Sequence, residues 1–211
     1  MNRHNPPPLA LARSRPGRAS LLAALLLSLG LAAWDPAAAG VLFSAPFLSF
    51  DTGATPFSVA AGDLNGDGKP DLAVANSGAG TVSILLGNGD GTFRPRSDYG
   101  TGDQPYAVAI GDLNGDGKPD LAVANYASGT VSVLLGNGDG TFGARTDYGT
   151  GDGASFVAIH DLNGDGKADL VTVDSGTSGI SVLLGKGDGT FGALTDIAAS
   201  NVNNLRFADV N

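Results

Sequence analysis

Oxygen-bearing side chains are concentrated in three nearly identical loops. The segment DLNGDGKPD begins at Asp63 and again at Asp112, and DLNGDGKAD begins at Asp161. In each copy Asp or Asn stands at the first, third, fifth and ninth places, and alternate positions of a tightly curved loop point inward. Such a cluster suits Ca²⁺, which accepts about 6 to 8 oxygen ligands at flexible angles, better than Mg²⁺, which prefers a strict octahedron. The pattern therefore predicts one calcium site in each loop.

The other residues of the first loop agree with this prediction. Gly66 and Gly68 permit backbone angles that other residues resist, and Lys69 stands seventh, where a calcium loop offers its backbone carbonyl. The loop is not an EF-hand, because its twelfth residue is Val74 rather than glutamate. The alternative is a polar β-turn, which Asn, Asp and Gly favour without any ion. Three copies that keep every ligand position favour the calcium site.

The charge of the chain also favours cations as partners. The 211 residues include 21 acidic and 12 basic side chains, a net charge of −9, and every acidic residue is an aspartate. Without residues 1–39 the net charge is −12. So acidic a protein is not expected to bind nucleic acid, whose phosphates require Lys and Arg. There is no cysteine, so disulfides cannot brace the fold.

Residues 1–39 have the composition of a secretory signal peptide. A leader rich in arginine precedes an apolar run at 21–34, and three alanines at 37–39 follow. There is no twin-arginine pair, which favours Sec export over the Tat route. The alternative is an uncleaved anchor, for which the apolar run is short. The mature protein is therefore expected to be secreted, extracellular or periplasmic, without a membrane span.

A repeat of 49 residues sets the expected architecture. The acidic loops follow this interval, and so does a second signature, LLGNGDGTF at 85–93 and 134–142 and LLGKGDGTF at 183–191. Each unit contains four apolar runs of strand length, which in the second unit are 106–111, 121–125, 130–135 and 142–148. The connections are too short for crossover helices, so neighbouring strands are expected to pair antiparallel.

The composition of these runs indicates how the sheets are covered. In the second and third runs, small uncharged residues alternate with large apolar ones, which indicates that both faces are buried. In the fourth run, Arg94, Arg96 and Asp98 alternate as in an edge strand. The fold predicted is therefore all-β, with one β-propeller blade of four antiparallel strands in each repeat. An open β-solenoid is the alternative.

The same period divides the chain into segments. Residues 40–56 precede the repeats, and the three blades are expected at 57–105, 106–154 and 155–203. Residues 204–211 resemble the approach to a fourth acidic loop, with Asp209 in the position of its first aspartate. A propeller needs about four blades or more to close, so the sequence is expected to be an incomplete propeller fragment.

The motifs resemble the FG-GAP (VCBS-type) repeat family, known from the propeller of integrin α subunits and from many secreted bacterial proteins. The resemblance covers residues 57–211 and rests on VAAGDLNGDGKPDLAVAN, VAIGDLNGDGKPDLAVAN and VAIHDLNGDGKADLVTVD with the second signature following each. It implies calcium ligands at the first, third, fifth and ninth loop positions and the seventh carbonyl. These are Asp63, Asn65, Asp67, Lys69 and Asp71; Asp112, Asn114, Asp116, Lys118 and Asp120; and Asp161, Asn163, Asp165, Lys167 and Asp169. The family's Phe-Gly pair is not kept, so ligand recognition of the integrin kind is not expected.

Three functions fit this interpretation. The favoured one is a non-catalytic, calcium-stabilised scaffold for binding or adhesion, with an unidentified protein or surface glycan as partner. The second is the propeller of a secreted enzyme that cleaves polysaccharides or lipids, which would show insertions converging at one mouth, whereas the three units have equal length. The third is a glycan-binding lectin, which would show tryptophan or tyrosine recurring with the period, whereas Trp34 lies in the leader.

Three further features have simpler interpretations. The segments 138–143 and 187–192 spell GxGxxG, but a strand rather than a helix is expected to follow, so they are interpreted as hairpin turns. His160 is the only histidine of the mature chain and is interpreted as a packing or hydrogen-bonding residue, because zinc needs further ligands. Phe93, Phe142 and Phe191 recur with the period and are expected to pack between blades.

Overall fold

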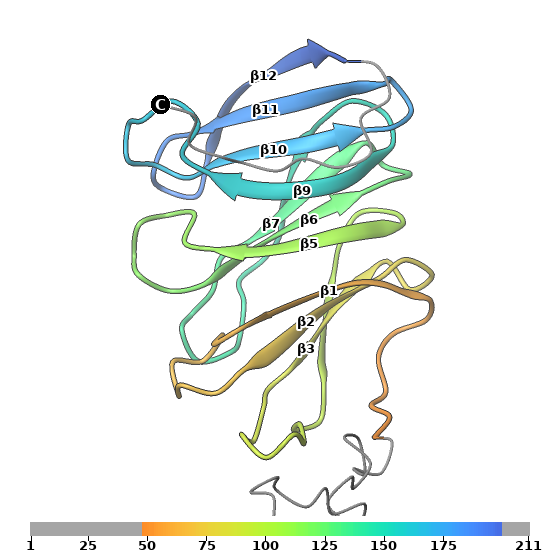
Figure 1. The fold of residues 1–211 in the computed structure, drawn as a ribbon, viewed down its shortest axis with the longest axis vertical. Coiled ribbons are helices and arrows are strands. Elements are labelled where there is room, and N and C mark those ends of the chain that lie inside the picture. Colours follow the sequence, from red (N-terminus) through yellow and green to blue (C-terminus); the bar gives the residue numbers. More distant parts are fainter. Residues whose placement is uncertain (1–47, 200–211) are drawn as a thin grey trace, which may run out of the picture. The chain divides into compact units, whose positions relative to one another are not determined.

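The computed structural model describes residues 48–199, and these form three four-stranded antiparallel sheets (Figure 1). Sheet 1 has the order β1-β2-β3-β4, with β1 (Pro56–Gly62), β2 (Asp71–Asn76), β3 (Thr81–Leu85) and β4 (Ser97–Gly100). Sheet 2 has β5 (Pro105–Gly111), β6 (Asp120–Asn125), β7 (Thr130–Leu134) and β8 (Thr146–Gly149). Sheet 3 has β9 (Ala154–His160), β10 (Asp169–Asp174), β11 (Gly179–Gly185) and β12 (Phe191–Ala198). The predicted all-β fold of blade-like sheets is confirmed, and the described residues form no closed propeller.

Residues 1–47 and 200–211 lie outside the described part of the chain. The predicted signal peptide and the start of a fourth repeat fall there. Within residues 48–199, no helix is long and apolar enough to cross a membrane.

Each acidic loop connects the first and second strands of a sheet. The register pairs Gly62 with Asp71, Gly111 with Asp120 and His160 with Asp169, so the ninth loop residue is also the first residue of the second strand. The second strands of sheets 2 and 3 are buried along their whole length. The loops are therefore anchored directly to the most buried strands.

The fourth strand differs from the expectation. We expected it at 142–148 in the second unit, but β8 begins at Thr146, and Phe142 makes only an isolated bridge with Gly136. In sheet 1 the same connection contains Pro95, which has no N–H to continue the ladder. In sheet 3, by contrast, β12 begins at its phenylalanine, although its pairing with β11 shifts register between Leu183 and Gly185. As predicted from their charges, β4 and β8 are exposed edge strands.

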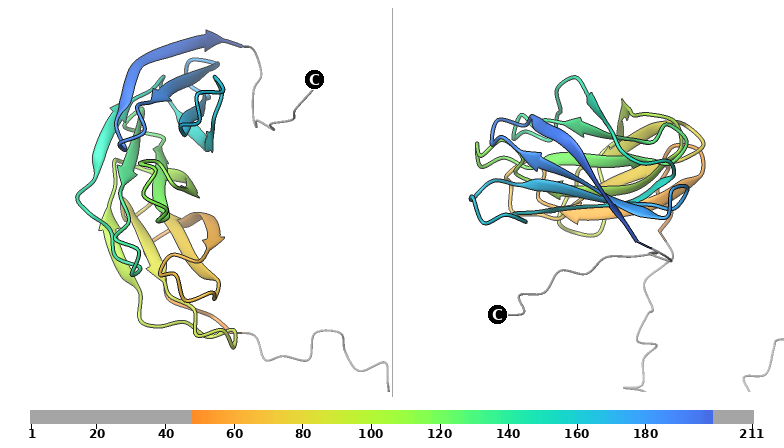
Figure 2. Two further views of the ribbon diagram at one scale, coloured as in Figure 1. Left: turned by 90° about the vertical axis from the view of Figure 1, so that its left-hand side faces the viewer. Right: turned by 90° about the horizontal axis from the view of Figure 1, so that it is seen from above.

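Consecutive sheets pack face to face and enclose two apolar cores (Figure 2). Leu121 and Val123 of β6 face the core shared with sheet 1, whereas Ala122 and Ala124 face the core shared with sheet 3. Side chains on both faces of β6 are therefore buried between sheets, as we predicted from the alternation in its sequence. The inner strands β1, β5 and β9 lie beside one another in chain order.

The recurring phenylalanines join one sheet to the next. Tyr99 of sheet 1 meets Phe142 of sheet 2 edge to face at 5.5 Å between ring centroids, and Tyr148 meets Phe191 of sheet 3 at 5.1 Å. Phe142 and Phe191 are buried. Such aromatic pairs contribute about 0.5 to 1.5 kcal/mol beyond their buried area. The predicted role in packing between blades is confirmed for Phe142 and Phe191, whereas Phe93 meets Phe50 of the segment that precedes sheet 1.

Candidate metal centre

The first aspartate of each loop holds the turn together. The Asp63 carboxylate accepts hydrogen bonds from the backbone N–H groups of Gly66 (2.7 Å), Asp67 (3.1 Å) and Gly68 (2.7 Å). Gly66 and Gly68 have φ of 74° and 78°, and this left-handed backbone suits glycine. Asp112 and Asp161 accept the corresponding bonds in the other two loops.

The third and fifth residues continue the same pattern. The Asn65 side-chain oxygen accepts a hydrogen bond from the Asp67 N–H (2.9 Å), and the Asp67 carboxylate accepts one from the Lys69 N–H (3.0 Å). The Lys69 ammonium lies 3.5 Å from the same carboxylate. In the second loop, the backbone N–H of Lys118 lowers the pKa of Asp116 below its usual value. This carboxylate is therefore ionised at neutral pH, as a metal ligand must be.

The ninth aspartate joins the loop to the second signature. The buried Asp71 carboxylate accepts a hydrogen bond from the Leu64 N–H (2.9 Å) with one oxygen and from the Gly87 N–H (2.6 Å) with the other. A Cβ at Gly87 would lie 2.1 Å from the Pro70 carbonyl oxygen, so only glycine fits. Asp120 binds Leu113 and Gly136 in sheet 2, and Asp169 binds Leu162 and Gly185 in sheet 3. The two repeated signatures are thus one structural unit.

The carboxylates of a loop lie close enough to influence one another. Burial raises the pKa of Asp120 above its usual value, and the nearby charges of Asp116 and Asp112 raise it further, although the N–H groups of Gly136 and Leu113 oppose the shift. A cation among these three carboxylates would relieve the repulsion.

Each loop brings its predicted ligands together within nine residues, but their carboxylates do not converge. In the part of the chain that the structure describes, no three acidic or histidine side chains gather in a group that could hold a metal ion. The donor chemistry still fits calcium, because the loops offer only oxygen atoms and a carboxylate has about four lone-pair sites for further bonds. Calcium binding stays a prediction.

Arg94 is a neighbour of the first loop that sequence reasoning missed. Its guanidinium lies 3.9 Å from the Asp67 carboxylate. The other two units have Gly143 and Gly192 at this position, and among the described residues the aspartates of their loops form an ion pair only with the lysine of the same loop. The signal was present in the sequence as FRPR against FGAR and FGAL, but we interpreted Arg94 only as part of an edge strand.

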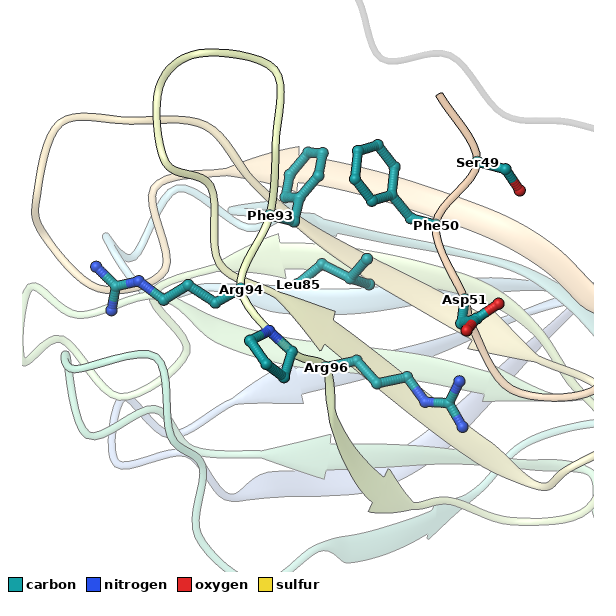
Figure 3. Close-up of a pocket in the computed structure, with 8 residues that line it drawn as sticks. Ser49, Phe50, Asp51, Leu85, Phe93, Arg94 and Arg96 are labelled. Atoms are coloured by element: carbon teal, nitrogen blue, oxygen red, sulfur yellow. The ribbon is translucent and has the colours of Figure 1, made fainter. Parts of the chain in front are cut away.

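The same segment lines a cavity of about 510 Å³ at the edge of sheet 1 (Figure 3). Its apolar part comes from Leu85, Pro95 and the edge-to-face pair of Phe50 and Phe93, whose ring centroids are 5.0 Å apart. Arg94 and Arg96 extend from it in opposite directions. Arg96 binds the Asp98 carboxylate (3.1 Å) and the Thr52 carbonyl (2.6 Å). Two guanidinium groups directed apart do not form one anion site.

A short stack of aromatic rings was also missed. Phe57 of β1 stacks on Tyr106 of β5 with centroids 4.1 Å apart, and Tyr106 stacks on Tyr126 at 4.5 Å. Phe57 remains 58% exposed. The positions of Phe57 and Tyr106, one period apart, could have indicated this contact between sheets.

The remaining motifs of the sequence have structural positions. The segment 138–143 lies in the turn between β7 and β8, where the Asp139 carboxylate accepts hydrogen bonds from the Thr141 N–H and hydroxyl. No helix follows it, so its interpretation as a turn is confirmed. His160 is exposed at the end of β9.

Comparison with known families supports the repeat interpretation. The model of the FG-GAP-like repeat matches residues 30–74, 63–123, 112–172 and 161–211. The chain belongs to the FG-GAP-like repeat family. The first matched segment of this FG-GAP protein begins at residue 30, within the predicted signal peptide. No curated protein matches the chain.

Several solved structures resemble the FG-GAP sheets. An Agrocybe aegerita lectin that recognises non-reducing terminal N-acetylglucosamine is 30% identical, with a TM-score of 0.49 over 66% of this chain and 37% of the lectin. The Photorhabdus luminescens Tc holotoxin pore is 23% identical, with a TM-score of 0.39 over 71% of this chain and 7% of its own. A functionally unknown Desulfotomaculum acetoxidans DSM 771 protein is 18% identical, with a TM-score of 0.46 over 70% and 48%. The chain spans less than half the length of each.

Proposed function

We propose that this FG-GAP protein is an exported, non-catalytic scaffold that is stabilised by one Ca²⁺ in each acidic loop and binds a protein or a surface glycan. The observation that supports it best is the buried ninth aspartate. Asp71, Asp120 and Asp169 each connect an acidic loop to the Gly-rich turn of the same sheet. An ion held by the loop would act on the same side chain that fixes the sheet.

The predicted ligands have distinct tasks in this proposal. The first, third and fifth residues of a loop would hold the ion from the exposed side, and the ninth aspartate from the buried side, together with the seventh carbonyl. Bound calcium supplies positive charge at the centre of the carboxylates. Without calcium, the Lys69 ammonium supplies part of that positive charge. The Lys69 side chain is 42% exposed, so it can turn away when the ion binds.

The repeat itself supports a scaffold rather than an enzyme. Three units of 49 residues share almost the same sequence, whereas a catalytic site needs residues that depart from the repeat and converge. Three bound ions would change the mature net charge from −12 to −6, which couples folding to calcium by mass action.

Calorimetry on the exported protein tests the calcium sites. We expect three sites per chain and a melting temperature that rises with calcium. Asp116→Ala should remove one site. Asp139→Ala is the matched control, because Asp139 is an exposed aspartate of the same sheet that accepts its hydrogen bonds from Thr141 and lies outside the acidic loop. Three sites remaining in Asp116→Ala, or no effect of calcium on melting, would contradict the proposal.

Mass spectrometry of the exported protein tests the localisation separately. We expect Gly40 or a close neighbour as the new N-terminus, because the alanines before it are typical of a cleavage site. A mature product that retains residues 21–34 would overturn the assignment of the leader.

A further inference from the structure

Sheets 1 and 2 contain the same buried polar relay. In sheet 2 the Asn125 amide N–H donates to the Ser132 hydroxyl (2.9 Å), and this hydroxyl donates to the Asp147 carboxylate (2.6 Å). Asn76, Ser83 and Asp98 make the same relay in sheet 1, at 2.8 and 2.6 Å. The asparagine is fully buried in both sheets. Each relay therefore depends on a side chain that donates a proton to serine.

Sheet 3 has an aspartate where the others have asparagine. One oxygen of Asp174 lies 2.5 Å from the Ser181 hydroxyl, and the same hydroxyl lies 2.9 Å from an oxygen of Asp196. The Gly151 N–H also donates to this hydroxyl (3.0 Å). A serine has one proton to donate, so it can serve only one of two carboxylates. The second contact requires a proton on a carboxyl group.

Burial decides which carboxyl group has that proton. Asp174 is 1% exposed, whereas Asp196 lies on the exposed edge strand β12. Burial raises the pKa of Asp174, and the charge of Asp196 raises it further, against the hydrogen bonds from Ser181 and Thr172. The proton is therefore placed on Asp174, whose O–H then takes the role of the asparagine N–H.

A second substitution in sheet 3 complements the first. Thr172 stands where sheet 2 has Val123, and its hydroxyl donates to the other oxygen of Asp174 (2.8 Å). In sheets 1 and 2 the equivalent oxygens of Asn76 and Asn125 are buried and, among the described residues, have no hydrogen-bond partner. A neutral carboxylic acid still accepts such a bond while it donates from its second oxygen.

We propose that Asp174 is held as a neutral carboxylic acid that donates to Ser181, and that its ionisation at higher pH weakens the attachment of β12 to sheet 3. If Asp174 is ionised, it and Asp196 compete for the one proton of the Ser181 hydroxyl, so one of the two carboxylates loses its hydrogen bond to Ser181. Both aspartates line a cavity of about 240 Å³ together with Ile197 and Ala198 at the end of β12, which pair there with Ile180 and Gly179 of β11. Loss of the relay would weaken the pairing of β12 with β11 beside this cavity.

The charged neighbours of Asp174 do not offset this effect. Asp196 faces it from β12, and Asp152 lies on the connection before β9, where its carbonyl accepts a hydrogen bond from the Gly176 N–H (2.9 Å). β11 contains no titratable residue, and His160 and Asp169 of β9 and β10 lie at the opposite end of the sheet. The nearby charges are thus negative, which favours the neutral acid.

The direction of the pH effect follows from these states. Below about pH 3.9, the usual pKa of an aspartate, Asp174 is neutral in both the folded and the unfolded chain, and its contribution to stability is complete. As pH rises from there to the higher pKa of the folded state, the unfolded chain ionises first, so stability is lost. Above the folded pKa the loss is constant.

Melting of the calcium-loaded full chain as a function of pH tests the proposal, with Asp174→Asn as the variant. Asparagine is the residue of the other two sheets, so this variant is expected to fold. Its melting temperature should equal that of the unmodified protein near pH 4. With rising pH it should become the higher of the two, by about 3 to 5 °C for each unit that separates the two pKa values of Asp174. Asn125→Asp is the matched control and should introduce the opposite pH dependence in sheet 2.

A direct measurement keeps the test independent of folding of the variants. The side-chain carboxyl ¹³C resonance of Asp174 in the unmodified protein should titrate above the range of an exposed aspartate. A melting difference that does not change with pH would overturn the proposal, and so would a resonance that titrates near pH 4.

Discussion

At the scale of single residues, the aspartates of one loop have different structural roles. Asp112 and Asp116 bind backbone N–H groups at the surface, whereas Asp120 is buried and binds Leu113 and Gly136. All three are predicted ligands, but only the last also stabilises the sheet directly. The two roles are separable by substitution.

Asp120→Ala is expected to destabilise the protein with or without calcium. It leaves two buried N–H groups without partners, which costs about 2 to 5 kcal/mol. Asp116→Ala should leave the calcium-free protein nearly unchanged, because its side chain is exposed, and should lose only one site. Urea denaturation with a chelator distinguishes the two variants. Equal losses of stability would contradict the distinction.

Arg94 is expected to weaken the first calcium site relative to the other two. Arg94→Gly, which restores the residue of the other units, should raise calcium affinity of the first loop by about two- to five-fold at low salt, as for exposed charge pairs. The measurement is calorimetry in a background of Asp116→Ala and Asp165→Ala, where only the first loop titrates.

Arg145→Gly is the control for this experiment, because Arg145 pairs with Asp147 of the edge strand. It should leave the affinity unchanged. An unchanged affinity in Arg94→Gly would show that its guanidinium does not reach the first site.

At the scale of elements, the acidic loop and the Gly-rich turn form one unit in each sheet. Gly136 donates to Asp120, and its Cβ position lies 2.1 Å from the Pro119 carbonyl oxygen. The third residue of the second signature is therefore glycine, because the backbone of the acidic loop lies directly against it.

Gly136→Ala is expected to cost about 2 to 4 kcal/mol in free energy of unfolding, because the backbone must move to admit the methyl group. Gly149→Ala, at the end of β8, is the matched control, because a Cβ there meets no atom within 4 Å. It should change stability by less than about 0.5 kcal/mol. Chemical denaturation measures both, and a tolerated Gly136→Ala would refute the close approach.

At the scale of the whole molecule, sheets 1 and 3 each expose apolar side chains whose equivalents in the other sheets are buried between sheets. Val59 of sheet 1 is 61% exposed, whereas Val108 and Val157, its equivalents in sheets 2 and 3, are 8% and 4% exposed. Leu162 of sheet 3 is 39% exposed, whereas its equivalent Leu64 is 1% exposed. These two faces have the composition of surfaces that are buried between sheets.

A polypeptide of residues 40–211 is therefore expected to associate in solution, even with calcium, because repeat units gain much of their stability from neighbours. Val59→Asp should reduce the association seen by light scattering, and Ala79→Asp, at an exposed hairpin, should not. A monodisperse monomer that melts cooperatively would contradict this expectation.

The repeat, the antiparallel sheets, their edge strands and the position of each acidic loop could be predicted from the amino-acid sequence. These features are local, since alternation along a strand and the turn chemistry of Asp, Asn and Gly act over a few residues. The calcium ligands were also placed from the sequence, and their binding of calcium stays a prediction.

The contacts between groups that lie far apart in the sequence could not be predicted and appear only in the folded chain. Asp71 reaches Gly87, Arg94 reaches Asp67, and Asp174 and Asp196 share Ser181 although the two aspartates stand at opposite sides of β11. The short fourth strand of sheets 1 and 2 could not be predicted either. These contacts depend on how strands pair and which side chains are buried. The protonation of a buried carboxyl group such as Asp174 depends on a neighbour in another strand, here Asp196. The residue pattern within a single segment therefore does not predict it.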